Sequence, residues 1–247
     1  MRRTGSASAT TTSSIACRRR SSTGTPAPRS RAGSGAPSSR TCASSRTGAG
    51  SPAAGSRLVP ETLPGMRVAP LDRPAAGRHA AALAALDAAL AEELGAAYSH
   101  LRWREENFLK DVPGKWELSR LALCPDGSVA GFWIASGAGA DAHTHRVAVA
   151  PAHRKAGVGL AMFEALRAAA RRRRHRRMVL TVSARNPGAN RFYERLGFTR
   201  LRGGDLAEFV RSHGREGVVI GDEIEETVDG ARYRYWGWAL DLEARCD

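Results

Sequence analysis

A short turn with two glycines and two basic residues carries the clearest chemical signal in the sequence. Residues 154–159 read Arg-Lys-Ala-Gly-Val-Gly and lead into a segment with apolar residues at helical spacing. The first N–H groups of a helix have no partners within the helix and, with the helix dipole, favour an anionic phosphate. Gly157 and Gly159 let a ligand approach the backbone closely, and Arg154 and Lys155 add positive charge. The turn is therefore predicted to bind phosphate, with simple tight packing around the glycines as the alternative.

Two histidines precede this turn at a spacing that suits proton transfer. His143 and His145 begin a strand-like stretch at 143–150, and residues two apart on a strand share a face. Because histidine titrates near neutrality, the pair is a candidate base or relay. The alternative is that both are solvated residues at the start of a strand. No third ligand for a metal ion is evident near them, so we expect no metal.

The segments around these residues predict an α/β domain with a mixed sheet. Two turn signals support hairpins, Pro-Asp-Gly at 125–127 and Asp-Gly at 229–230. Glycine- and alanine-rich residues 137–142 are expected to form a loop. The expected strands are 66–71, 116–124, 128–136, 143–150, 178–182, 198–201, 217–228 and 231–240, and the expected helices are 75–97, 100–110, 156–172 and 189–196.

Two longer stretches resemble motifs of one enzyme family. Residues 143–160 read His-Thr-His-Arg-Val-Ala-Val-Ala-Pro-Ala-His-Arg-Lys-Ala-Gly-Val-Gly-Leu. Residues 186–198 read Asn-Pro-Gly-Ala-Asn-Arg-Phe-Tyr-Glu-Arg-Leu-Gly-Phe. In this order they resemble motifs A and B of the GNAT family of N-acetyltransferases, and the resemblance covers about residues 66–202. It implies a single domain at 66–247 with a mostly antiparallel central sheet flanked by helices; residues 203–247 are matched least closely.

The resemblance also implies a binding site for acetyl-coenzyme A. The cofactor of this family lies where the strand of motif A splays from the next strand. Backbone groups of Val147 and Val149 are then expected to pair with the pantetheine arm, and the Val149 N–H to stabilise an oxyanion. Asn186 and Asn190 are expected to reach the same arm. The pyrophosphate is expected on the backbone N–H groups of Arg154, Lys155, Ala156, Gly157, Val158 and Gly159.

The resemblance implies direct acetyl transfer to a primary amine in a ternary complex. Tyr193 matches the usual general acid of the family, and a phenol with a pKa of about 10 suits a thiolate leaving group whose thiol has a pKa of about 8.5. The segment with His143 and His145 is similar to that of arylalkylamine N-acetyltransferases, in which two histidines relay protons. The acceptor is expected to be a small-molecule or peptide amine, and a homodimer is a candidate assembly.

The formal net charge of +14 is concentrated before the predicted domain. Residues 1–60 contain ten arginines and no acidic residue, which leaves 28 basic against 24 acidic residues in the remainder. Residues 1–57 contain one Ile and no Leu, Val, Phe, Tyr or Trp, so we predict that residues 1–60 form a disordered tail. The tail is a dispensable extension, a transit peptide or a nucleic-acid-binding arm. The last reading supports an alternative function, a nucleic-acid-associated protein without catalysis, although we expect no nucleic-acid partner.

Cysteine spacing and hydropathy indicate the kind of cellular compartment in which the protein is expected. The four cysteines are scattered without a CxxC pair, which favours a reducing compartment, and we expect a cytoplasmic protein. No run of about 18 apolar residues is present, so no membrane partner is expected.

Overall fold

The computed structural model describes residues 65–95, 98, 100–214 and 217–243. The chain divides into residues 1–56 and 57–247, and all described residues belong to the second unit. The predicted tail at 1–60 lies outside the described residues.

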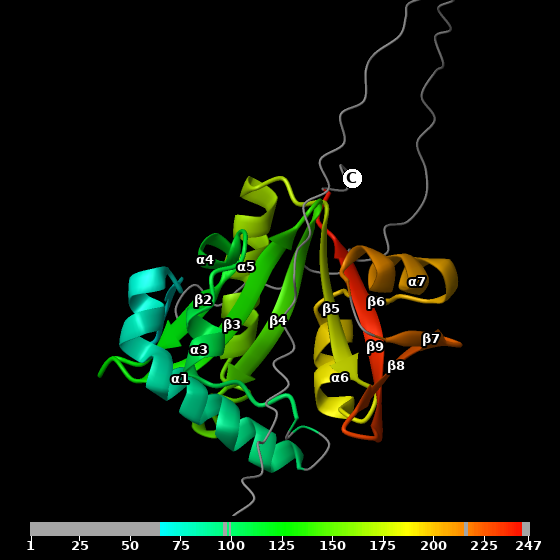
Figure 1. Cartoon of the computed structure of the whole chain (residues 1–247). Coiled ribbons are helices and arrows are strands. Elements are labelled where there is room, and N and C mark those ends of the chain that lie inside the picture. The colour runs from blue at the N-terminus through cyan, green and yellow to red at the C-terminus, as the bar shows by residue number, and fades with distance from the viewer. Residues whose placement is uncertain (1–64, 96–97, 99, 215–216, 244–247) are drawn as a thin grey trace, which may run out of the picture. The chain divides into compact units, whose positions relative to one another are not determined.

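The described strands form one sheet in the order β1-β2-β3-β4-β5-β9-β8-β7, and β6 pairs with β9 beside this path (Figure 1). Neighbouring strands are antiparallel except β4 and β5, which are parallel. The predicted mixed, mostly antiparallel sheet is confirmed. The strands are β1 (Arg67–Pro70), β2 (Arg120–Leu123), β3 (Val129–Ala138), β4 (Asp141–Val149), β5 (Arg177–Ser183), β6 (Thr199–Arg200), β7 (Val218–Ile220), β8 (Glu223–Val228) and β9 (Ala231–Asp241).

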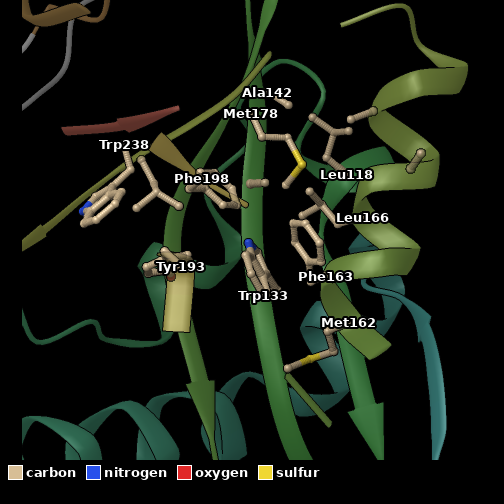
Figure 2. Packing of buried hydrophobic residues seen from close by; sticks show 14 of the residues in the cluster. Leu118, Trp133, Ala142, Met162, Phe163, Leu166, Met178, Tyr193, Phe198 and Trp238 are labelled. Carbon is tan, nitrogen blue, oxygen red and sulfur yellow. The ribbon is translucent and has the colours of Figure 1, made fainter. Parts of the chain in front are cut away.

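Helices cover both faces of the sheet. Successive strand residues point to opposite faces, so Phe132 packs in a cluster with α1 and α3 while Trp133 packs in a cluster with α5 and α6. Figure 2 shows the second cluster, with Trp133 between Phe163 and Tyr193. The helices are α1 (Arg73–Leu94), α3 (Glu105–Leu109), α4 (Lys115–Leu118), α5 (Val158–Arg172), α6 (Pro187–Arg195) and α7 (Gly203–Ser212), with a short 3-10 helix, η1 (Pro151–His153).

A third apolar cluster lies under α7, next to β5 and β9. Leu206 and Phe209 of α7 are almost fully buried and pack with Val179, Tyr235 and Ala239. This helix is absent from the sequence prediction, and it brings the end of α7 close to the strands that carry the candidate site.

Two predicted elements differ in kind from the structure. The first half of the strand expected at 116–124 is the helical turn α4, which ends before β2. The loop expected at 137–142 is mostly strand, because β3 and β4 continue almost to their turn. The hairpin at Asp229 and Gly230 is confirmed between β8 and β9; both residues have positive φ, at 49° and 78°. In the described part of the chain, no helix is long and apolar enough to cross a membrane.

Candidate active site

Strands β4 and β5 pair at one end and then diverge. In the described structure their pairing covers only Asp141, Ala142 and His143 of β4. Beyond this point β5 stays paired with β9 along Arg177–Ser183, while β4 continues to Val149 along β3 (Figure 1). The joined end is held by Asp141, whose carboxylate accepts hydrogen bonds from Arg177 at 2.9 and 3.0 Å.

A β-bulge interrupts β4 beside this divergence. His143 and Thr144 pair with Ser136 and Ala135, whereas the next pair joins Arg146 to Ile134, so His145 is the additional residue. After the bulge, the Val149 carbonyl accepts a hydrogen bond from the Arg154 side chain at 3.1 Å rather than from β3.

The bond pattern sets the direction of the β4 backbone after the bulge. The Ala150 N–H donates to the Ala130 carbonyl at 2.9 Å, so Ala150 faces β3 and Val149 faces away from it. Val147, two residues earlier, shares the direction of Val149, because backbone groups alternate along an antiparallel pair. The two residues expected to meet the pantetheine arm thus direct their backbone groups to the side where β5 diverges.

The turn at 154–159 lies at the start of α5. Gly157 precedes the helix with φ at 86°, a conformation that favours glycine, and Lys155 also has positive φ, at 61°. Among the described residues, no side chain caps the first N–H groups of α5. An added Cβ on Gly159 would lie 3.3 Å from the Phe192 ring, so this glycine also allows α5 and α6 to pack closely.

Arg154 forms an ion pair with Glu93 of α1. Its guanidinium donates two hydrogen bonds to the Glu93 carboxylate, at 2.6 and 2.7 Å, and this carboxylate raises the pKa of Arg154. Lys155, by contrast, is an exposed cation of the turn. Within the turn, therefore, Lys155 and the helix N–H groups are the features that best suit a phosphate.

The two asparagines predicted to contact the cofactor make hydrogen bonds within the protein. The Asn186 side chain accepts from the Ala189 N–H at 3.0 Å and caps α6. Asn190 is buried, donates to the Ser183 carbonyl and accepts from the Trp238 indole, both at 3.2 Å. Both residues thus anchor α6 beside β5, and their contact with a cofactor remains a prediction.

Tyr193 lies in the buried cluster under α6 (Figure 2). Its ring packs edge-on against Trp133 and Phe198, with centroids 6.2 and 5.5 Å away. Burial raises the pKa of the Tyr193 hydroxyl, and the nearby Tyr98 phenol adds to this effect. The hydroxyl is protonated at neutral pH, as an ordinary phenol is, and its raised pKa makes it a weaker acid than the sequence expectation of about 10 assumes.

The two predicted histidines lie together despite the bulge. The ring centroids of His143 and His145 are 4.6 Å apart. Ser136 of β3 lies beside them, with its Oγ 2.6 Å from His145 Nε2. A third histidine, His213, follows α7 with its centroid 5.0 Å from that of His143. Neither Ser136 nor His213 belongs to a motif, so no sequence pattern points to them.

A buried ion pair connects α1 to β4 next to the histidines. Arg146 Nε and Nη2 donate to the two carboxylate oxygens of Asp87, at 2.5 and 3.1 Å. The Asp87 side chain is fully buried and also accepts from the Trp103 N–H at 2.7 Å. This pair fixes the segment after α1 against β4, and it too was missed by sequence reasoning.

The segment between α1 and α3 supplies two further side chains. The Tyr98 hydroxyl is buried and has no hydrogen-bond partner among the described residues. His100 lies 3.1 Å from the Tyr235 hydroxyl, with its ring stacked on Tyr233 at 3.7 Å. Burial lowers the pKa of His100, which favours a neutral imidazole. His100 therefore places a polar group against Tyr233 and Tyr235 of β9.

The sequence model of the acetyltransferase (GNAT) family matches residues 83–198, from within α1 to the end of the second motif. This range holds the divergent strands, the turn at 154–159 and Tyr193. The chain contains an acetyltransferase domain of the GNAT family. Comparison with curated proteins gives no match to the chain.

Solved structures of acetyltransferases share the fold. A GNAT acetyltransferase from Staphylococcus aureus Mu50 has 13% identity and a TM-score of 0.52, covering 72% of this chain and 99% of its own. An acetyltransferase from Streptococcus agalactiae 2603 has 17% identity and a TM-score of 0.50, covering 70% and 97%. A putative acetyltransferase from Salmonella typhimurium, solved with acetyl-CoA, has 17% identity and a TM-score of 0.48, covering 74% and 97%.

In the part of the chain that the structure describes, no group of three or more His, Cys, Asp or Glu side chains is arranged to hold a metal ion.

Proposed function

We propose that this acetyltransferase transfers an acetyl group from acetyl-CoA to a primary amine by direct attack in a ternary complex. The observation that carries the proposal is the divergence of β4 from β5. It leaves the backbone groups of Val147 and Val149 directed away from β3 and not paired with β5.

The residues present fit the cofactor at both ends. An anionic pyrophosphate suits the uncapped N–H groups at the start of α5 and the exposed Lys155. A pantetheine arm is an amide chain, and it suits a strand whose backbone donors and acceptors point away from the sheet. In such a site the cofactor supplies an activated thioester carbonyl.

Two proton transfers are needed, one from the substrate ammonium and one to the thiolate of coenzyme A, and different side chains would carry them out. His143 and His145 would take a proton from the substrate ammonium, so that a neutral amine can attack. The Val149 N–H would stabilise the negative charge that develops on the carbonyl oxygen. Tyr193 would give its proton to the departing thiolate and regain one from the attacking amine.

A thiol-release assay with acetyl-CoA and a panel of amines tests this function. The panel should contain polyamines, arylalkylamines, amino acids, aminoglycosides and peptides with free N-termini. Turnover with at least one of them is the expected result. Tight binding of acetyl-CoA without turnover of any amine would refute the enzymatic proposal.

Two charge reversals at opposite ends of α5 test the cofactor site. Lys155 and Arg174 are both exposed cations with positive φ, at 61° and 59°. Lys155→Glu is expected to weaken acetyl-CoA binding by about tenfold or more in calorimetry, because it sets a negative charge beside the pyrophosphate. Arg174→Glu, at the other end of the helix, should leave the affinity unchanged. Equal affinities for the two variants would place the phosphates elsewhere.

A further inference from the structure

A cluster of three histidines extends from the bulge in β4 to the end of α7. The ring of His143 lies between those of His145, at 4.6 Å, and His213, at 5.0 Å. Phe209 of α7 contacts His143 and His213 through its ring, at 6.0 and 4.6 Å. The three imidazoles therefore form a continuous row, of which only the first two belong to a family motif. His213 lies beyond the residues that match the family.

The outer end of this row is built to hold a positive charge. His213 Nε2 lies 3.8 Å from Asp141 Oδ2, and the two side chains are 3% and 8% exposed. The other ring nitrogen, Nδ1, lies 3.1 Å from the Phe209 carbonyl, which can only accept a hydrogen bond, and this contact favours a proton on Nδ1. His213 also occupies the C-terminal end of α7, where the helix dipole favours a cation.

Further charged groups surround this end. The Arg177 guanidinium from β5 binds the same carboxylate of Asp141, and Asp205 of α7 and Asp241 of β9 act electrostatically on Arg177. The charge of Asp141 also acts on His175, which precedes β5, and partly offsets the lowering of its pKa by burial. Ser212 links the row to the surface, because its exposed hydroxyl lies 3.0 Å from His213 Nδ1.

We propose that His213, paired with Asp141, completes a proton path that runs from His145 through His143 to the surface at Ser212. The path rests on the proposed acetyl transfer. The substrate ammonium loses one proton to His145, and this proton passes to His143, to His213 and then to solvent. The second proton of the amine leaves through Tyr193 and ends on the thiol of coenzyme A. The balance is one ammonium and one thioester giving one amide, one thiol and one released proton.

His213 acts through His143 and is therefore a positioning residue, so its test is the pH dependence of the rate. His213→Gln is expected to lower kcat/KM about tenfold at pH 7. This factor corresponds to the stabilisation that a helix C-terminus gives to a nearby imidazolium. The deficit should shrink as pH approaches the pKa of the amine, because the neutral amine then needs no proton path. His79→Gln, on α1, is the matched control and should follow the unchanged profile. A deficit of equal size at every pH, or no deficit, would overturn the proposal.

Histidine NMR titrations of the full chain provide a test that does not depend on turnover. In the unmutated protein, two neighbouring histidine resonances should titrate in coupled, two-step curves. His213→Gln should convert the His143 curve into a single step, and His79→Gln should not. Single-step curves in the unmutated protein would refute the path, even if His213→Gln fails to fold. If no amine is turned over but the coupled curves are present, the proposed function fails while the charge coupling in the row stands.

Discussion

Breaking the buried pair of Asp87 and Arg146 should cost far more stability than breaking an exposed pair of the same chemistry. The structure offers both in one place. Asp87 and Arg146 join α1 to β4, with side chains 0% and 11% exposed. Glu93 and Arg154 join α1 to the turn after β4 through two bonds of 2.6 and 2.7 Å, with side chains 48% and 36% exposed. The two pairs thus differ mainly in burial.

The expected magnitudes follow from what each substitution leaves behind. Asp87→Asn keeps the size of the side chain but leaves the Arg146 guanidinium buried without a counter-charge. We expect a loss of about 3–5 kcal/mol in the free energy of unfolding. Glu93→Gln leaves Arg154 in contact with water, and we expect a loss of about 0.2–1 kcal/mol. In a domain with a total stability of about 5–15 kcal/mol, only the first change would approach unfolding.

Urea unfolding followed by circular dichroism measures both changes. The double variant Asp87→Leu with Arg146→Met removes both buried charges and should lose less stability than Asp87→Asn alone, because no unpaired charge remains. If Asp87→Asn costs less than about 1 kcal/mol, or if Glu93→Gln costs as much, burial does not govern the strength of these pairs and the reasoning fails.

Two further predictions concern single buried side chains. Tyr193→Phe keeps the ring contacts and removes the acid; it should lower kcat about 100-fold with little change in acetyl-CoA affinity, as steady-state kinetics and calorimetry can measure. An unchanged kcat would remove Tyr193 from this role. Burial lowers the pKa of Lys115 to about 8 from its ordinary 10.5. Between these values the unfolded chain binds the proton that the folded chain lacks, so the unfolding free energy should rise by about 2 kcal/mol from pH 8 to pH 10.5. Urea titrations at the two ends of this range should show no such rise for Lys115→Met.

The features that could be predicted from the sequence are those encoded locally. The glycines at 157 and 159, the apolar stretch at 147–149 and the turn at Asp229 and Gly230 each determine a short piece of backbone by themselves. The strand and the helix around the turn at 154–159 followed from them, and the resemblance to the family motifs then indicated a mixed, mostly antiparallel sheet.

The features that could not be predicted depend on contacts between distant residues. Leu206, Phe209 and Val210 have helical spacing, but Gly203 and Gly204 at the start of α7 weaken the pattern. Without α7, nothing in the sequence brings His213 near His143. The pairing of Asp87 with Arg146 likewise depends on how α1 packs on β4, and Asp87 is a single charge in an alanine-rich helix.

The additional residue in β4, His145, is needed for the proposed chemistry but not for the fold. Ala142 and Thr144 before the bulge, and Val147 and Val149 after it, all point to the face of α5, although their spacing is broken by one residue. A chain that lacked one residue at this point could keep a regular ladder with β3 and the same apolar core. It would lose only the additional residue, which is His145 itself. The regular pairing of β4 with β3 is thus interrupted at the residue that would accept a proton from the substrate. A deletion of this residue would yield a folded protein without its proposed base.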